Sequence, residues 1–388
     1  MPAQNTTRTQ PNARPDTQQG IQPGTAYQSK PARGTHRRLL TPPLAQKNGI
    51  DPIQLILPHL EDLPAELFPT SATPNNTAPA TIADYLTARF YPNDPQTIHA
   101  RFDTGEVRLD DGTVLTSDSP YMPGERIWYF RELADEPELP SDMPVLYEDE
   151  HVLAIDKPHF LPTTPRGSYI AQTALTKLRV REQNPLLIPI HRLDRPTAGV
   201  LLFAKTVEAR RPFQMMFQHR QVSKTYRAVA PMPTDAAAEQ ALSAEGLQVR
   251  SHIQKIRDQL QVQQLSEQEC VAQGVEPNTL TTVKILRTFT PSAQAVEGWR
   301  AEPTLNEKRE WALYDLAPHT GKTHQLRAHL NLLGSPILGD VLYPQVLPDA
   351  PDRPEYPLQL LAYSLHFEHP ITGERVDLYS GRSLTAAS

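Results

Sequence analysis

The sequence predicts an α+β protein with more than one domain. Residues 200–204 form a continuous apolar run and residues 222–230 alternate between apolar and polar, two patterns typical of core strands. Between them, Phe213, Met216 and Phe217 are spaced as on one face of a helix. A length of 388 residues suggests two or three domains. We therefore expect strands and helices to be interleaved along the chain.

The N-terminal part differs in composition from the rest. The chain has 40 prolines and only 38% apolar residues, so we expect part of it to be unable to pack. Residues 1–36 are rich in Pro, Thr, Gln and Gly, which predicts a disordered tail. The tail is basic, so it is either an arm that contacts phosphates or a solubilising segment with no partner.

Residues 37–144 divide into three segments that differ in composition. Residues 37–79 are proline-rich with a short apolar segment at 53–57, which indicates an extension. Residues 80–132 predict a small globular module: a helix on the spacing of Ile82, Leu86 and Phe90, then two short strands at 102–109 and 110–114 joined by an Asp-Gly turn. Residues 133–144 contain acidic residues and prolines and predict a linker.

Residues 145–380 predict the largest domain. A strand pair at 145–158 opens it, and the helix that follows has a basic face, including Arg179, which we expect to be solvated. Residues 231–278 have few large apolar groups, so we expect a peripheral insertion there. Residues 280–288 and 311–316 again have patterns that predict strands. Thr323 is placed to cap a helix that follows them.

Composition excludes several function classes. No apolar run of about 18 residues occurs and no secretory signal is recognisable, so we expect neither a membrane span nor export. The single cysteine, Cys270, excludes an intrachain disulfide and a cysteine metal cluster, which favours the cytoplasm. The net charge of −6 means that any nucleic-acid affinity must come from local patches.

Asp194 is the most informative candidate for chemistry. It lies between Arg192 and Arg195, just before the apolar run at 200–204, so a carboxylate sits at the mouth of a core strand. Because a nearby positive charge favours the ionised form, we expect Asp194 to be an anion at neutral pH. It could serve as a nucleophile or proton acceptor. The alternative is a structural Asp that caps the turn and pairs with one of these arginines.

Several segments resemble one enzyme family in the family's own order. Residues 191–199 resemble the H-R-L-D-x-x-T-S-G signature of the RluA-type pseudouridine synthases, with Ala198 in place of Ser. The other matching segments are 156–158 (N-K-P), 224–228 (K-x-Y-x-A), 320–330 (T-G-R-T-H-Q-I-R-x-H-L), 334–343 (G-x-P-I-x-G-D-x-x-Y) and 361–366 (L-x-L-H). The module at 80–132 resembles an S4-type RNA-binding domain, which is often fused ahead of such synthases.

The resemblance implies a fold and a set of roles. The fold is a mixed, largely antiparallel central sheet flanked by helices. Asp194 would act at the sugar, either attacking C1′ or removing the 2′ proton, Tyr226 would cover the target base, and Arg327 would hold Asp194. The resemblance also assigns substrate binding to Arg192, Arg195, Thr197, Lys224 and His324.

The implied reaction converts specific uridines of structured RNA, ribosomal or transfer, into pseudouridine after the base is flipped out. It has no redox step or group donor, so we expect no cofactor. His324 and His329 are five residues apart without an acidic partner, which argues against a metal site. We expect RNA as the partner, no membrane contact and a monomer.

Two other functions remain open. One is a catalytically inactive RNA-binding protein on the same scaffold, against which Asp194, Tyr226 and Arg327 argue because all three are present. The other is a carboxylate-dependent nucleoside or glycoside hydrolase. Such an enzyme needs a second acidic residue across the cleft, and no partner accompanies Asp194 in its motif.

Overall fold

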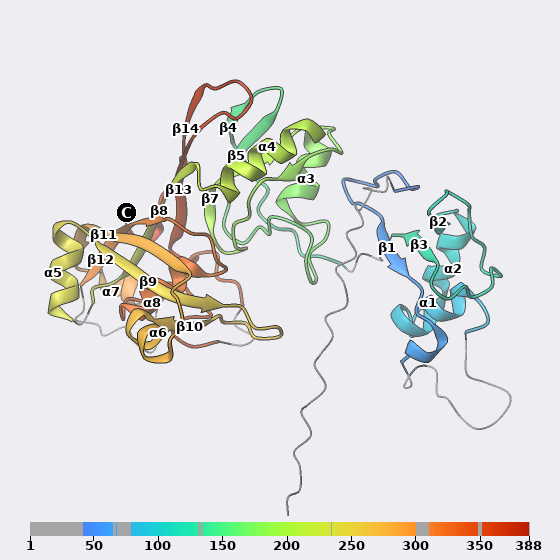
Figure 1. The fold of residues 1–388 in the computed structure, drawn as a ribbon, viewed down its shortest axis with the longest axis horizontal. Helices are drawn as coiled ribbons and strands as arrows, with labels where there is room; N and C mark the ends of the chain where they lie inside the picture. The colour runs from blue at the N-terminus through green and yellow to red at the C-terminus, as the bar shows by residue number, and fades with distance from the viewer. Residues whose placement is uncertain are drawn as a thin grey trace, which may run out of the picture. The chain divides into compact units, whose positions relative to one another are not determined.

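The computed structural model describes residues 42–64, 67, 79–130, 133, 135–233, 235–299, 310–347 and 351–387 (Figure 1). The predicted tail at 1–36 and most of the residues between 64 and 79 lie outside these ranges. Among the helices described, none has the length and apolar character needed to cross a membrane.

The N-terminal unit is a three-stranded antiparallel sheet with two helices. Its strands lie in the order β1-β3-β2. The apolar segment of the predicted extension forms β1, which pairs with β3, so it belongs to the same packed unit as the helices. The elements are β1 (Ile53–Ile56), the short helix η1 (Leu60–Asp62), α1 (Ile82–Phe90), α2 (Pro95–Asp103), β2 (Arg108–Leu109) and β3 (Arg126–Tyr129).

Neither strand predicted at 102–109 and 110–114 forms as predicted. The first is reduced to β2 at 108–109, and the second to an isolated bridge between Val114 and Arg108. Residues 95–103 form helix α2 rather than the start of a strand at 102. Asp94 caps the helix by accepting from the backbone N–H of Thr97, and Pro95 occupies the first helical turn, where no amide partner is needed. The capping signal and the buried pair Ile98 and Phe102 therefore override the short strand pattern that follows.

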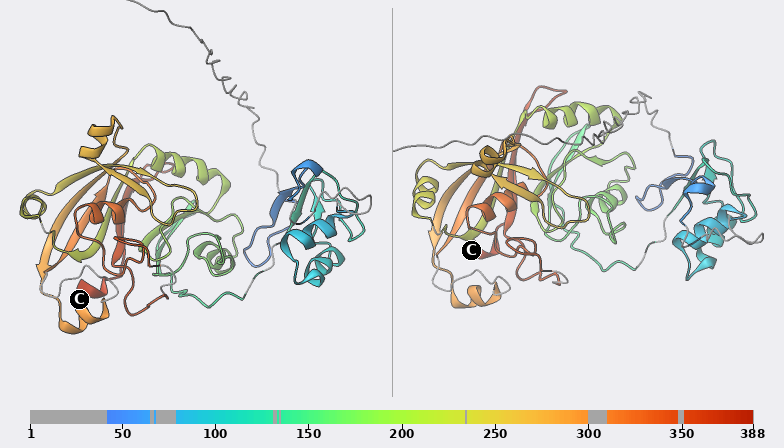
Figure 2. Two further views of the ribbon diagram at one scale, coloured as in Figure 1. Left: turned by 90° about the horizontal axis from the view of Figure 1, so that it is seen from below. Right: turned by 60° about the horizontal axis from the view of Figure 1, so that its bottom comes forward.

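The larger unit is built on one eleven-stranded sheet. Nine strands lie in the order β10-β9-β11-β12-β8-β13-β7-β5-β4, with β14 on β13 and β6 on β7. Every pairing is antiparallel except β13 with β7. The prediction of a mixed, largely antiparallel sheet is confirmed, with β10 at one end of the strand order and β4 at the other. These strands are labelled in Figure 1, and Figure 2 gives two further views of the fold.

The bounds of its elements follow the chain. They are β4 (Val145–Glu148), β5 (Val152–Lys157), α3 (Ala174–Arg181), β6 (Ile188–Pro189), β7 (Ala198–Ala204), α4 (Val207–Gln218), β8 (Val222–Pro231), α5 (Ala236–Ala244), β9 (Leu247–Gln254), β10 (Gln263–Ser266), α6 (Glu267–Gln273), β11 (Thr279–Phe289), α7 (Ala293–Gly298), β12 (Trp311–Pro318), α8 (Gln325–Leu332), β13 (Leu360–Glu368), β14 (Arg375–Tyr379) and η2 (Thr385–Ala387).

Helices cover both faces of this sheet. On one face, Leu201 and Phe203 of β7 pack in the cluster that includes α3, and Leu326 of α8 packs in a neighbouring cluster. On the other face, Val200 and Leu202 pack in the cluster of α4. All seven residues of β7 are buried, because a strand covered on both faces has no solvent side. We call the side of α3 and α8 the α3/α8 face.

Residues 231–278, predicted to be a peripheral insertion, supply the strands β10 and β9 at one edge of the main sheet. Strand β9 pairs with β11, and Val249, Ser251 and Ile253 alternate with less buried residues along it. The apolar content of the segment is low because only every second position of β9 faces the core.

His329 of α8 is fully buried among hydroxyl groups. Its Nε2 lies 2.9 Å from Ser251 Oγ and 3.1 Å from Thr279 Oγ1, and its Nδ1 lies 2.9 Å from Thr281 Oγ1. Burial lowers the pKa of His329 to about 4. A neutral imidazole suits this site, because hydroxyls can both donate to and accept from it.

His329 should make stability depend on pH under acid conditions. Its folded pKa of about 4 lies below the unfolded value of about 6.5, so between these values the unfolded state binds the extra proton. Its stabilising contribution is complete above about pH 6.5 and falls by about 1.4 kcal/mol per pH unit as the pH drops towards 4. Urea midpoints measured from pH 7.5 to 4.5 should decrease, and less steeply in His329→Gln. Equal slopes in the two proteins would contradict this assignment.

Candidate functional site

The loop that carries Asp194 is held by hydrogen bonds to Thr163 and within its own turn. Thr163 Oγ1 donates to the carbonyl of Leu193 (2.9 Å) and accepts from its N–H (3.2 Å), and the carbonyl of Asp194 accepts from the N–H of Thr197 (3.0 Å). Thr197, to which the resemblance assigns substrate binding, is buried in this turn. The turn thus fixes where the Asp194 side chain leaves the backbone.

Lys157 supports the same loop and was not singled out from the sequence. Its Nζ is fully buried and donates to the carbonyls of Pro158 (2.9 Å), Leu161 (2.8 Å) and Arg195 (3.3 Å). Burial lowers its pKa to about 7, although the Asp194 charge opposes the shift. The Asp-Lys-Pro segment was the only sequence signal for it, and the segment gives no hint of these acceptors.

Gly199 allows the strand behind Asp194 to pair closely. Its φ is +113°, and a Cβ there would lie 2.2 Å from the carbonyl oxygen of Ala362 on β13. Any larger residue would push apart β7 and β13, the one parallel pair of the sheet. Gly199 therefore allows the start of β7, next to the Asp194 loop, to pair with β13.

Arg327 reaches Asp194 from helix α8. Its Nη1 lies 3.3 Å from Asp194 Oδ2, and the Asp194 side chain keeps 36% of its surface exposed while that of Arg327 keeps 3%. The pairing predicted between these two residues is present. An accessible carboxylate is thus held at the end of a buried guanidinium.

Asp340 is the main partner of Arg327 and was missed by sequence reasoning. Arg327 Nε donates to Asp340 Oδ2 (2.7 Å) and Nη2 to Oδ1 (2.5 Å), which is a two-pronged, charge-assisted pair. Oδ1 also accepts from the N–H groups of Leu342 and Tyr343. Burial alone would lower the pKa of Arg327, but Asp340 and then Asp194 raise it above its ordinary value. The G-D-x-x-Y segment was the signal that could have identified this carboxylate.

Tyr226 lies at the boundary between two hydrophobic clusters of the α3/α8 face. Its ring packs against the cluster of α8 and against the cluster of α3, so it occupies the boundary between them on the α3/α8 face. Burial, and then the charge of Asp194, raise the pKa of Tyr226. The phenol therefore stays neutral and presents an apolar ring close to Asp194.

His324 completes the cluster around Asp194. Its Nε2 lies 3.9 Å from Asp194 Oδ2, and its Nδ1 lies 3.3 Å from the hydroxyl of Tyr343. Burial and then the Arg327 charge lower the pKa of His324, against the opposing effect of Asp194. The residue has φ +55° and occupies the N-cap of α8 without a side-chain cap, so the predicted cap by Thr323 is wrong.

The two arginines beside Asp194 do not pair with it. Arg195 forms a two-pronged ion pair with Asp352 (2.7 and 2.5 Å) and stacks against Tyr169 at 5.2 Å. Arg192 is exposed and makes no hydrogen bond or ion pair with any described residue. The cation that contacts Asp194 is instead Arg327, which comes from α8.

Lys224 and Arg179 also differ in their surroundings. Lys224 lies two residues before Tyr226, is half-buried near Gly321, and has a pKa lowered by burial. Arg179, predicted to be solvated, is buried and donates to the carbonyl of Leu187 and to Asp51. The Arg179 side chain therefore contributes to packing around α3 and is not solvated.

Comparison with known proteins places the chain in a family. The RNA pseudouridylate synthase family model matches residues 151–332. The tRNA pseudouridine synthase C of Pasteurella multocida is 30% identical over 244 residues, which cover 61% of this chain and 90% of that protein. An uncharacterized RNA pseudouridine synthase of Synechocystis is 28% identical, covering 67% and 78%. The ribosomal large subunit pseudouridine synthase D of Pseudomonas aeruginosa is 25% identical, covering 76% and 86%.

The chain belongs to the RluA-type pseudouridine synthases. The predicted activity, conversion of uridine to pseudouridine in RNA by an isomerase, is confirmed at the level of this family.

Proposed function

We propose that Asp194 is the carboxylate that acts on the sugar of the target uridine. In the reaction the N1–C1′ bond breaks, the uracil turns, the C5–C1′ bond forms, and C5 loses its hydrogen while N1 gains one. One carboxylate must assist at C1′ or at the 2′ position. The observation that carries the proposal is that Asp194 keeps an accessible carboxylate 3.3 Å from the buried guanidinium of Arg327, with the Tyr226 ring close by.

The neighbouring side chains have complementary roles in this proposal. Arg327 orients Asp194, Tyr226 covers one face of the uracil, and His324 borders the sugar. A flipped uridine leaves a gap in the RNA stack, and unpaired Arg192 has the planar, charged group needed to fill it. Lys224 supplies a positive charge for the phosphate of the same nucleotide. Arg195 contributes by holding its loop rather than by touching substrate.

A carboxylate-dependent hydrolase is the strongest rival, and the second carboxylate bears on it directly. Asp340 lies behind Arg327, fully buried, with both oxygens engaged. A general acid in glycoside hydrolysis must reach the leaving group. Asp340 has no surface from which to do so, which favours isomerisation.

We propose structured RNA, ribosomal or transfer, as the substrate of a cytoplasmic monomer. Relatives named for tRNA and for the large ribosomal subunit motivate both classes. Carbodiimide mapping of RNA from cells with and without the gene should reveal uridines that lose modification in its absence. Identical maps would overturn the assignment of these RNAs.

Chelation should leave activity unchanged. Within the described residues, no group of three or more His, Cys, Asp or Glu side chains is placed to hold a metal ion, and no step of the proposed reaction requires one. Turnover of a short unstructured RNA should therefore survive dialysis against EDTA. Loss of turnover that zinc restores would contradict the proposed mechanism and favour a metal-dependent hydrolase.

We propose that the N-terminal unit is S4-like and positions RNA. Several of its cations are paired internally, Lys47 and Arg101 with Glu106 and Arg126 with Asp110, so we expect a modest contribution. Deleting residues 1–132 should raise KM and flatten the salt dependence of binding, with little change in kcat, since phosphate contacts position RNA without touching the reacting atoms. A folded truncation with unchanged KM and salt slope would refute this role.

A further inference from the structure

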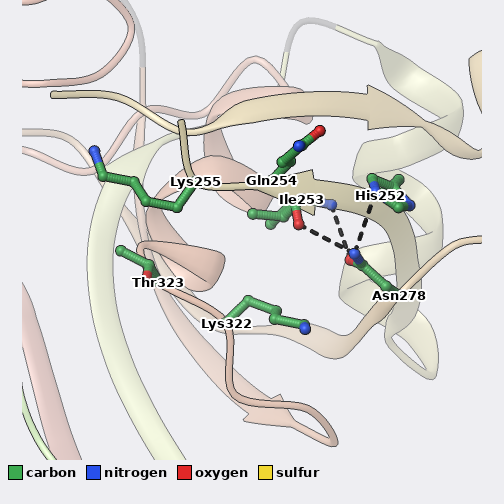
Figure 3. Close-up of a pocket in the computed structure, with 7 residues that line it drawn as sticks. All are labelled: His252, Ile253, Gln254, Lys255, Asn278, Lys322 and Thr323. Atoms are coloured by element: carbon green, nitrogen blue, oxygen red, sulfur yellow. Dashed lines mark hydrogen bonds between the residues drawn. The ribbon is translucent and has the colours of Figure 1, made fainter. Parts of the chain in front are cut away.

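A cleft of about 420 Å³ adjoins the Asp194 cluster and has no part in the mechanism above. Thr323, which lines it, immediately precedes His324, whose Nε2 is 3.9 Å from Asp194. One residue of the cleft lining is therefore the direct neighbour in sequence of a residue in the Asp194 cluster. Its lining residues are His252, Ile253, Gln254, Lys255, Asn278, Lys322 and Thr323 (Figure 3).

The lining is cationic and contains no acidic side chain. Lys322 is exposed, makes no hydrogen bond or ion pair with any described residue through its ammonium, and extends towards Asn278 in Figure 3. Its backbone is fixed, because its N–H donates to Gln325 Oε1 (3.1 Å), which also accepts from Thr320 Oγ1. A free ammonium on a fixed loop is suited to an anionic ligand.

His252 offers a different surface at the same cleft. Its Nδ1 donates to the carbonyl of Glu276 (2.9 Å), and its Nε2 accepts from Asn278 Nδ2 (3.4 Å). The Asn278 side chain is fixed in turn by the N–H and carbonyl of Ile253. Both ring nitrogens are therefore engaged by neighbouring groups, and the imidazole is held by its edges. What it can still present to a ligand is a flat ring face.

The β9–β10 hairpin that bears this cleft is tied to the catalytic cluster. The N–H of Val262 donates to the hydroxyl of Tyr343 (3.0 Å), the same hydroxyl that lies 3.3 Å from His324 Nδ1. Gln261 Nε2 also donates to the carbonyls of Leu342 and Pro344. Lys255 Nζ donates to the carbonyls of Gln259 and Leu260 at the hairpin turn. The distance between cleft and catalytic cluster is therefore set by the fold.

We propose that this cleft binds one unpaired nucleotide adjacent to the target uridine, with its phosphate on Lys322 and its base against the ring of His252. The inference rests on the proposed function, because it takes the RNA strand to pass Asp194. Sequence-specific recognition of RNA acts mostly on unpaired bases, which stack on aromatic side chains, while cations bind the backbone. An aromatic ring held by its edges and a free ammonium in one cleft match those two halves of a nucleotide.

Lys322→Gln tests the phosphate contact, with Lys284→Gln as the matched control. Lys284 is an exposed lysine on β11, opposite Asp315 of β12, and it does not line the cleft. The probe is the transcribed RNA fragment that carries the mapped uridine. Lys322→Gln should weaken binding roughly tenfold at low salt and reduce the log–log salt slope by about 0.7 to 0.9. Lys322→Arg should restore the slope, and Lys284→Gln should match the wild type.

RNA fragments shortened on either side of the target uridine locate the contact. On one side only, removing the neighbouring nucleotide should eliminate the difference between wild type and Lys322→Gln, because the contact is then absent in both. His252→Leu should raise KM about fivefold or more, and His252→Phe, which keeps a ring, should raise it less.

The outcomes separate the inference from the function on which it rests. Lys322→Gln with the KM and salt slope of Lys284→Gln would overturn the inference, as would a Lys322→Gln defect that persists on both shortened fragments. If the wild-type protein formed no pseudouridine on any RNA, the proposed function itself would fail. Wild-type turnover with unaffected Lys322 and His252 variants would remove only the nucleotide subsite.

Discussion

Asp194→Asn should abolish pseudouridine formation and leave RNA binding intact. Asn has the same shape as Asp but can neither attack C1′ nor accept a proton, so turnover should fall by more than about a thousandfold. Arg327 keeps its two-pronged pair with Asp340 in this variant, so the fold of the site should persist. Tritium release from RNA labelled at C5 of uridine measures turnover, because C5 loses its hydrogen in the reaction.

Asp315→Asn is the matched control for this experiment. Asp315 is on β12 opposite Arg227, on the sheet face away from Tyr226, and should be replaceable without loss of turnover. Filter binding at equal protein concentration shows whether Asp194→Asn still holds RNA. Appreciable turnover by Asp194→Asn would exclude a catalytic role for this carboxylate.

The position of Asp194 was predictable because the signals for it are local. A polar turn followed by an apolar run predicts a loop at the mouth of a buried strand, and β7 is buried along its whole length. The spacing of Leu326 and Leu330 likewise predicts helix α8, which carries Arg327. Periodicity indicates which face of an element is buried. It does not indicate which charged groups from distant elements meet.

Apart from the pairing of Arg327 with Asp194, which the family resemblance implied, the partners of the charged residues could not be predicted. Arg195 neighbours Asp194 in sequence yet pairs with Asp352, more than 150 residues away. Arg179 was assigned to the solvent side because it lies on the basic face of its predicted helix, but Asp51 and two backbone carbonyls compensate its burial. An ion pair depends on the whole fold, so sequence adjacency is a poor guide to it.

Backbone geometry also limited the sequence prediction at α8. Thr323 has the side chain expected of an N-cap, but His324 occupies that position in a left-handed conformation. A residue other than glycine rarely adopts positive φ, so the pattern favoured Thr323. The result is that His324 is turned towards Asp194 and Tyr343 at the first turn of the helix.

Asp340→Asn should weaken both stability and catalysis, although Asp340 lies behind Arg327 and cannot contact the substrate. The substitution keeps the volume but leaves the buried guanidinium of Arg327 without its main counter-charge, which should lower the free energy of unfolding by about 3 kcal/mol. Because Arg327 then loses its fixed direction, Asp194 should be misplaced and kcat should fall by about a hundredfold, with a smaller change in KM. Urea denaturation and tritium release measure the two effects.

Arg327→Lys separates orientation from charge in the same pair. Lysine keeps the positive charge, but a single ammonium cannot bind both oxygens of Asp340 and also reach Asp194 as the guanidinium fork does. We therefore expect Arg327→Lys to reproduce the loss in kcat with a smaller loss in stability than Asp340→Asn. If Asp340 were instead the general acid of a hydrolase, the wild type would release free uracil and Asp340→Asn would stop that release while Arg327→Lys retained part of it. Wild-type kcat and stability in Asp340→Asn would show that the orientation of Arg327 does not depend on this carboxylate.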